Sequence, residues 1–524
     1  MNQAYYNKTV LAMYDIRGIQ NYIFATNEVR DIIGASELVE NIMLKGLKCI
    51  IADHTEWDES NFIVEWEKDT KVAFLEDETI RMQVLFIGGG NAYVLFRDGK
   101  TCETINRELA KYVLERTYSL NLAVAVVPKS DNYMADYDAI NLEMRKVKAL
   151  MVPVKPIGAM PFMKVDSITG YPLTKISWYG EKSEITTESA CKQACLKKEE
   201  AEEKIFDNMV TEKGDNSTLA VVHIDGNSMG SRIKEIMQTK ADYKDAVTTM
   251  RIISQNIRNH FMEAFDDMCR MMDEKSDLVK EIRWSRLYRK IITAGDDITF
   301  ICNPKLAFAA VETFMRSVTE KDMYKEIGLS EADNHIKYGF SACAGIAFFN
   351  SHFPFSDAYQ VAEACCASAK GAAKEQQHRN KGEKDGFIGC YMDYQFCSNI
   401  RSAQLKEYRE KHYSYPDADG IMLARPYYIS APSYAEGTDL EERNEARSIE
   451  TLWTNLKAFT SYNKETRMVR SHAKELRNAF SLGLEGVDRY ITFLNSRDVA
   501  LPTTERESWY DVLEFMDFYT EGIR

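Results

Sequence analysis

Two adjacent carboxylates, Asp296 and Asp297, lie in the stretch TAGDDITF (residues 293–300). The apolar runs on either side of them, RKIIT and ITFIC, are typical of β-strands and predict a hairpin with both acids at its tip. Asp is common in tight turns, so a plain surface turn would explain the pair. Two acids held at the end of a rigid strand also form an arrangement that binds magnesium.

A third carboxylate, Asp225, ends the apolar run TLAVVHID (218–225) and is followed by GNSMG. A strand that leads through small residues into a helix leaves backbone N–H groups free for phosphate oxygens. If Asp225 and the hairpin acids converge on one side of a sheet, they repel one another unless divalent cations bind between them. Two such cations would activate a 3′-hydroxyl and stabilise the pyrophosphate that leaves an α-phosphate.

Two lysines, Lys370 and Lys374, are four residues apart in ACCASAKGAAKE and therefore share one helix face. A solvated helix end explains this spacing without any ligand. In a nucleotide-binding protein, the same two ammonium groups would reach the triphosphate.

The elements that position these residues occur twice along the chain. The runs TVLAMYDI (9–16) and TLAVVHID (218–225) are each followed by a segment with helical periodicity and then by a strand pair, 84–96 in one half and 290–302 in the other. Aligning the two tips places Gly90 opposite Asp296 and Asn91 opposite Asp297. A further strand follows each pair, at 120–128 and at 338–349, and then a helix. We therefore predict two copies of one α/β unit.

Composition narrows the class of protein. The chain of 524 residues is too long for one ordinary core, which predicts about two to four domains. A net charge of −14 argues against sequence-independent wrapping of nucleic acid, although a single cleft can still be basic. Eleven scattered cysteines predict free thiols in a reducing cytosol. No apolar run matches a membrane span and no signal peptide is recognisable, so we expect a cytoplasmic protein that does not enter a membrane.

Two sets of motifs resemble known families. HIDGNSMG, followed by AGDD and a later helix with SAK, is similar to the palm domain of the nucleotidyl cyclase and GGDEF superfamily. The segment YDIRGIQNYIFATNEVRDIIGASELVE (14–40) resembles the first palm of the large, polymerase-like subunit of type III CRISPR effector complexes. The resemblance covers about residues 5–400. The tip here begins with Ala294 instead of Gly, no His is followed by Asp as in the family's nuclease domain, and no Cys-x-x-Cys marks a zinc ribbon.

The resemblance implies an α/β (α+β) fold with two tandem, ferredoxin-like palm domains related by a pseudo-twofold axis. We expect a first palm with a connecting segment (1–190) and a second, catalytic palm (218–400). The charged, helix-prone stretch between them predicts a helical linker (191–217), and apolar residues at helical spacing predict a C-terminal helical domain (401–524). The implied catalytic residues and metal ligands are Asp225, Asp296 and Asp297, with Ile224 as a further metal ligand. The implied nucleotide-binding residues are Gly226, Asn227, Ser228, Met229, Gly230, Gly295, Lys370 and Lys374, and Gly89 and Gly90 in the first palm.

The function implied by the resemblance is a nucleotidyltransferase. It would use ATP and two Mg²⁺ or Mn²⁺ ions to make a cyclic oligonucleotide messenger, as in antiviral defence. The first tip carries no carboxylate, so we expect the first palm to bind a nucleotide acceptor without activating it. Two alternatives stay open: a scaffold subunit of an RNA-guided complex, and an enzyme that makes a single cyclisation or joins AMP to another small molecule. The partners we expect are a nucleoside triphosphate and, for a complex, effector subunits, guide RNA or a second copy.

Overall fold

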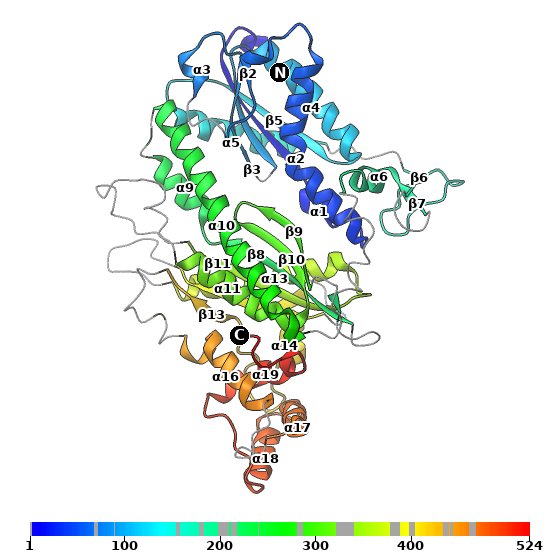
Figure 1. Cartoon of the computed structure of the whole chain (residues 1–524), viewed down its shortest axis with the longest axis vertical. Coiled ribbons are helices and arrows are strands. Elements are labelled where there is room, and N and C mark those ends of the chain that lie inside the picture. The colour runs from blue at the N-terminus through cyan, green and yellow to red at the C-terminus, as the bar shows by residue number, and fades with distance from the viewer. Residues whose placement is uncertain are drawn as a thin grey trace. The chain divides into compact units, whose positions relative to one another are not determined.

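The computed structural model divides the chain into two compact units, which are described separately below (Figure 1). Unit 1 comprises residues 1–204 and 228–258, and unit 2 comprises residues 205–227 and 259–524. The structure describes residues 3–67, 72–88, 90–152, 158–177, 183–196, 209–210, 217–238, 240, 242–279, 287–320, 340–377, 388–397, 404–432, 440, 444–460 and 468–524.

Unit 1 is built on a five-stranded sheet with the order β2-β3-β4-β1-β5. Its strands are β1 (Val10–Arg17), β2 (Phe62–Ile63), β3 (Met82–Gly88), β4 (Asn91–Phe96) and β5 (Asn121–Pro128). The interior strand β1 is apolar and buried along nearly its whole length because it has a neighbour on each side, β4 and β5, both antiparallel to it.

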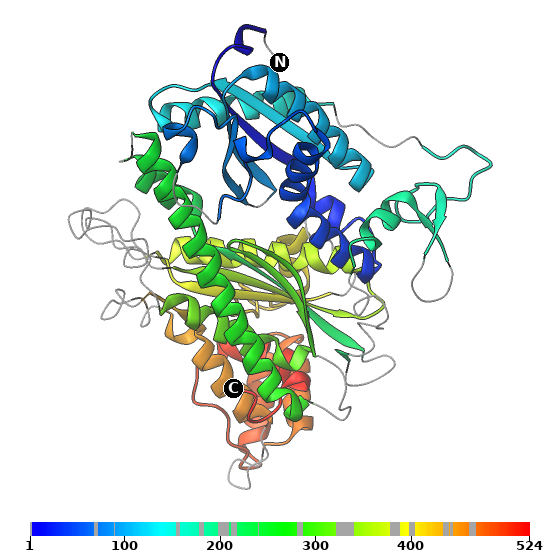
Figure 2. The same ribbon diagram turned by 45° about the horizontal axis from the view of Figure 1, so that its top comes forward.

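The helices of unit 1 cover this sheet and carry a small hairpin. They are α1 (Ile19–Ile23), α2 (Val29–Asp53), α3 (Ala73–Glu76), α4 (Gly99–Thr117), α5 (Tyr133–Leu150) and α6 (Thr187–Gln193), with 3₁₀ turns at Gln3–Tyr5 and Glu59–Asn61. Side-chain oxygens of Asp98 and Asn132 cap the first turns of α4 and α5. The hairpin of β6 (Leu173–Ile176) and β7 (Glu184–Thr186) projects away from the sheet of unit 1 (Figure 2).

Residues 228–258 pack with unit 1, although the sequence places them in the second palm. They contain α9 (Met229–Gln238) and the first part of the long helix α10 (Tyr243–Val279). The fully buried guanidinium of Arg251 donates to the carbonyls of Val84 and Leu85, both at 2.9 Å, where the β3–β4 ladder shifts register. A bulge leaves carbonyls without a ladder partner, and Arg251 supplies the missing donors.

Unit 2 repeats the sheet of unit 1 and extends it. Its six strands have the order β13-β12-β11-β8-β10-β9, in which β9-β10-β8-β11 corresponds to β3-β4-β1-β5. The strands are β8 (Thr218–Gly226), β9 (Tyr288–Ala294), β10 (Asp297–Cys302), β11 (Ala342–Asn350), β12 (Cys390–Phe396) and β13 (Tyr427–Ser430). β11 and β12 are parallel, and the other neighbours are antiparallel.

The remaining described helices belong to unit 2, as does the second part of α10. They are α11 (Ala307–Thr319), α13 (Phe355–Glu375), α14 (Leu405–Tyr413), α16 (Ile449–Thr460), α17 (Arg470–Phe480), α18 (Leu484–Asn495) and α19 (Trp509–Phe515), with 3₁₀ turns at Pro304–Leu306, Glu445–Arg447, Arg506–Ser508 and Met516–Phe518. None of the described helices is both long enough and apolar enough to cross a membrane.

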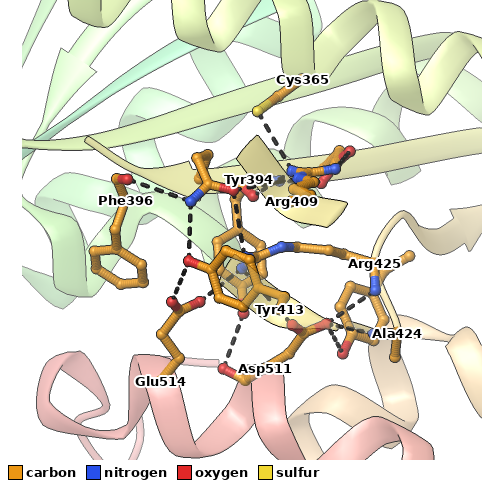
Figure 3. Close-up of polar contacts among 12 residues, drawn as sticks. Cys365, Tyr394, Phe396, Arg409, Tyr413, Ala424, Arg425, Asp511 and Glu514 are labelled. Atoms are coloured by element: carbon orange, nitrogen blue, oxygen red, sulfur yellow. Dashed lines mark hydrogen bonds and ion pairs between the residues drawn. The ribbon is translucent and has the colours of Figure 1, made fainter. Parts of the chain in front are cut away.

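A buried polar network fastens the C-terminal helices to the sheet (Figure 3). The guanidinium of Arg425, which is fully buried, forms an ion pair of 2.8 Å with Glu514 and lies 4.1 Å from the centre of the Tyr394 ring. Asp511 of α19 accepts hydrogen bonds from the backbone N–H of Arg425 at 2.8 Å and from the hydroxyl of Tyr427 at 2.9 Å. Because every member is buried, these charges depend on one another for compensation.

The fold class predicted from the sequence, two tandem palm-like α/β sheets with a C-terminal helical region, is confirmed. The alignment of the two tips is also confirmed, because Asp15 pairs with Asn91 in unit 1 and Asp225 pairs with Asp297 in unit 2. The sequence did not indicate β13, which lies beyond residue 400 and pairs with β12. Most of the predicted linker, at 197–208 and 211–216, lies outside the described residues.

Candidate functional site

The candidate site of unit 2 lies where β8 and the β9–β10 hairpin end together. Asp225 is directly opposite Asp297 in the antiparallel ladder, so both carboxylates arise at the same end of the sheet. The backbone N–H of Gly226 donates to the carbonyl of Asp296 at 3.2 Å, which holds the tip against β8. Gly295 has a φ of 67°, a left-handed conformation that favours glycine in the tip. The predicted convergence of the three acids is therefore a property of the register.

Helix α13 brings a second set of side chains to this end of the sheet. It packs closely on β11 because Gly345 has no side chain: a Cβ there would collide with the backbone of Ala362 and Cys366. Lys370 of α13 forms an ion pair with Asp225 and donates to the carbonyl of Gly226 at 3.2 Å. The predicted lysine therefore lies at the predicted acids.

Glu363 is a fourth acidic residue of the site, and sequence reasoning missed it. It lies seven residues, or two helical turns, before Lys370 on α13 and therefore on the same face. Its pKa is raised by burial and by the nearby charge of Asp225. The i, i+7 spacing was the signal that could have identified it.

The charge of Asp225 contributes to raised pKa values at three neighbouring acids, Asp296, Asp297 and Glu363. Burial and then the charge of Asp225 raise the pKa of Asp296. Burial, followed by the charges of Asp225, Asp296 and Glu363, raises the pKa of Asp297 to about 7. One ammonium group, that of Lys370, faces four carboxyl groups. Among the described side chains, the site therefore has more acidic groups than cationic ones.

His223, which the sequence analysis also missed, packs against Asp297. It precedes Asp225 by two residues on β8 and so points to the same face, which was the available signal. Its Nδ1 lies 3.2 Å from Oγ1 of Thr299 and 3.5 Å from Oδ1 of Asp297, and its ring meets that of Tyr359 edge to face. Burial lowers the pKa of His223 to about 4, so the imidazole is neutral at pH 7.

The other predicted residues of β8 and the following turn have different surroundings. Ile224 is fully buried and its side chain has no ligand atom. The side-chain amide of the buried Asn227 donates to Oγ of Ser341 at 3.2 Å and to the carbonyl of Gly389 at 3.3 Å. These two residues directly precede β11 and β12, so Asn227 holds the starts of both strands. Ser228 has a φ of 57° and precedes the start of α9.

The predicted phosphate-binding turn crosses the division between the units. Gly226 and Asn227 belong to unit 2, whereas Ser228, Met229 and Gly230 belong to unit 1. Lys374 is exposed near the end of α13, one turn beyond Lys370, and the structure does not place it at the acids. The roles of these residues toward a nucleotide stay predictions.

The residues of the site fit a divalent cation in charge and in donor type. Oδ1 of Asp297 is buried and accepts no hydrogen bond, and carboxylate oxygens are the donors that Mg²⁺ and Mn²⁺ prefer. Within the described part of the chain, however, no three His, Cys, Asp or Glu side chains are already arranged around a common point as metal ligands. Asp225 faces the Lys370 ammonium instead.

Unit 1 contains the same arrangement with fewer charges. Asp15 of β1 forms an ion pair of 2.5 Å with Lys148 of α5, as Asp225 does with Lys370 in unit 2. The backbone N–H of Ile16 donates to the carbonyl of Gly90 at 3.1 Å, which matches the bond between Gly226 and Asp296. Asn91, which is neutral, stands opposite Asp15.

The backbone conformation of the first tip explains why residue 90 is a glycine, without any ligand. Gly90 has a φ of 79°, and a Cβ there would collide with the side chain of Ile19. The turn therefore requires glycine at this position. Gly89 lies outside the described residues, and nucleotide binding by this tip stays a prediction.

Comparison with known proteins identifies one family. Residues 218–382 match the family described as Cas10/Cmr2, second palm domain. Comparison with curated proteins gave no match. Among solved structures, the chain is similar to Csm1 of T. onnurineus at 13% identity and a TM-score of 0.43, over 98% of this chain and 70% of that one. Csm1–Csm4 cassettes in complex with cA4 and with cA3 align at 12% identity, with TM-scores of 0.42 and 0.44, over 99% and 98% of this chain and 71% and 70% of theirs.

Proposed function

Because residues 218–382 match the Cas10/Cmr2 second palm domain, we propose that the chain is a divalent-cation-dependent nucleotidyltransferase. Its substrate would be ATP and its product a cyclic oligonucleotide. The observation that supports the proposal most strongly is that Asp225, Asp296 and Asp297 lie close together beside Lys370. A plain surface turn has no need of a carboxylate whose Oδ1 is buried without a hydrogen bond and whose pKa is raised to about 7 by burial and by its acidic neighbours.

In this proposal the acidic residues hold the cations and Lys370 contacts the triphosphate. Bound Mg²⁺ or Mn²⁺ would activate the attacking hydroxyl and neutralise charge on the departing pyrophosphate. The rigid β8–β10 ladder fixes the spacing of Asp225 and Asp297, so the protein supplies a preorganised anionic end of a sheet. His223, neutral at pH 7, would pack behind Asp297 and restrict its rotamers.

The first palm would hold the acceptor nucleotide. Its Asp15 forms an ion pair with Lys148, and its hairpin carries Asn91 in place of an acid, so the described residues of this tip do not repeat the acidic cluster of unit 2. Phosphate groups therefore meet less repulsion there than beside four carboxyl groups.

We further propose that the chain works in a type III CRISPR-like effector complex in the cytoplasm, with effector subunits and guide RNA as partners. The support is the domain family alone. A purely scaffolding subunit would not need the acidic cluster, and an enzyme that joins AMP to another small molecule would share it. Product analysis separates these functions.

The experiment is incubation of the purified chain with each NTP and Mg²⁺ or Mn²⁺, followed by mass spectrometry of the products. The Asp296→Asn/Asp297→Asn double variant should fold normally and retain less than about a tenth of the synthesis, because the amides keep the shape but lose the charge. Asp225→Asn should behave in the same way. Normal turnover by either variant would overturn the catalytic assignment.

A further inference from the structure

An ammonium group lies against the strand aspartate in each unit, at the same position of the repeat. Lys148 lies 15 residues after the first residue of α5, and Lys370 lies 15 residues after the first residue of α13. The partners are also equivalent, since Asp15 and Asp225 occupy matching places on β1 and β8. An ion pair between this lysine and the strand aspartate is therefore a feature of both copies of the repeat.

The two pairs differ in the charge around them. In unit 1 the neighbours of Asp15 are Gly90 and Asn91 at the tip, and Asn141 lies two turns before Lys148 on α5. One ammonium group there balances one carboxylate.

In unit 2 the same three positions hold Asp296, Asp297 and Glu363. Asp225 interacts with all three, and the Lys370 ammonium is the cation that faces them from α13. From β8, the neutral His223 adds no charge. One ammonium group thus balances at most one of four acidic side chains.

We propose that Lys370 competes with the divalent cation for Asp225, so that cation binding must first displace its ammonium group. In unit 1 the same pair of Lys148 and Asp15 stands without the additional acids, so by this proposal Lys148 would keep the place that a cation takes in unit 2. This inference rests on the proposed metal site of unit 2. It also explains why three carboxylates lie near one another without already forming a metal-ligand set.

The physical reason lies in charge and reach. A divalent cation brings twice the charge of an ammonium group and accepts several oxygen ligands at once, which suits an acidic cluster better than a single Nζ does. A lysine has a long, flexible stem, so its ammonium group can leave Asp225 without moving α13. The ammonium would then be free to meet an incoming phosphate near the same acids.

The test measures how tightly the whole chain binds Mn²⁺ in the absence of nucleotide. The electron paramagnetic resonance signal of free Mn²⁺ reports the fraction that stays unbound. Lys370→Gln should tighten Mn²⁺ binding by about threefold or more, because Asp225 loses its internal competitor. Lys370→Met is a second neutral variant with the same expected result. Lys370→Arg keeps the charge and should retain wild-type affinity to within about twofold.

A matched control distinguishes competition from a general effect of charge. Lys374→Gln removes the same charge one turn further along α13, at an exposed position, and should change the affinity by less than about twofold. Asp15→Asn should leave the amount of bound Mn²⁺ unchanged, since the cation place in unit 1 is taken by Lys148. If the Asp15→Asn variant bound less Mn²⁺ than the wild type, the inference for unit 1 would be overturned.

The remaining outcomes separate this inference from the proposed function. If Asp225→Asn binds Mn²⁺ as the wild type does, the metal site itself is wrong. If Asp225→Asn loses binding while Lys370→Gln and Lys370→Met, both folded by circular dichroism, bind as the wild type does, the metal site stands and the competition is refuted. Equal tightening by Lys370→Gln and Lys374→Gln would also refute it.

Discussion

Asp297 shows at the scale of one residue what supports the proposed cation site. It belongs to a stable β-ladder, yet its carboxyl group is surrounded by Asp225, Asp296 and Glu363, and its Oδ1 accepts no hydrogen bond. A protein that served only to fold would gain from a neutral side chain here. The cost to stability is the expected mark of a position selected for binding.

This cost predicts a pH-dependent effect of Asp297→Asn. The folded pKa of about 7 lies above the ordinary value of 3.8, so the folded state binds more protons than the unfolded state between these values. The free energy of unfolding contributed by Asp297 therefore falls as the pH rises from about 4 to about 7. The amide does not titrate, so the Tm gain of Asp297→Asn over wild type, measured in EDTA, should be small at pH 5 and larger at pH 8.

Asp58→Asn is a suitable control for this prediction. The Ser60 hydroxyl and backbone N–H lower the pKa of Asp58, so its folded and unfolded pKa values both lie below 5. Its effect on Tm should be the same at pH 5 and at pH 8. A Tm gain for Asp297→Asn that is equally large at both pH values would contradict the assignment of a raised pKa.

At the scale of elements, the distance between α13 and the sheet decides whether Lys370 and Glu363 reach the acids. Gly345 on β11 sets this distance because its missing side chain lets the backbone of α13 approach. The neighbouring strand register places Gly345 opposite His223, so helix, strand and site are linked through one small residue.

A pair of glycine substitutions tests this linkage. Gly345→Ala should destabilise unit 2 by about 2 kcal/mol or more and weaken Mn²⁺ binding, because the new methyl group pushes α13 away from β11. Gly371→Ala, within α13 and with open space around it, should stabilise the helix by about 0.5–1 kcal/mol. Chemical denaturation measures both. A Gly345→Ala protein as stable as wild type would show that α13 is not held by this contact.

At the scale of the molecule, the C-terminal helices complete unit 2. The buried Arg425 connects the residues before β13 with α19 through Glu514 and Asp511, so the last segments of the chain contribute to the same sheet-based unit as the acids (Figure 3).

The network predicts a large effect for Arg425→Ala. Removing this guanidinium leaves Asp511 and Glu514 buried without their cation, which should cost about 3–5 kcal/mol in the free energy of unfolding. Arg489→Ala breaks an exposed pair with Glu485 in the same region and should cost less than about 1 kcal/mol. Denaturant unfolding of both variants measures the difference, and similar values for the two would refute the structural role of the network.

The sequence by itself determined the repeat and the positions of its principal acids. Strands that carry Asp15 and Asp225 near their ends, and the hairpins that follow them, produce local patterns of apolar periodicity and turn residues that can be read directly. The sequence predicted that Asp225 and the hairpin acids converge on one side of a sheet, and the observed register, with Asp297 opposite Asp225, brings them together.

Only the tertiary structure decided which other residues join these acids. Glu363 comes to the acids from helix α13, and His223 lies beside them on the same face of β8. Their shifted pKa values arise mainly from burial, which no local sequence pattern records. The same holds for the packing of residues 228–258 with unit 1 and for β13, a strand of four residues whose pairing depends on an open edge of the sheet. The pairing of Lys370 with Asp225 was likewise beyond the sequence, because an ion pair between residues 145 positions apart forms only when the helix is seated on the sheet.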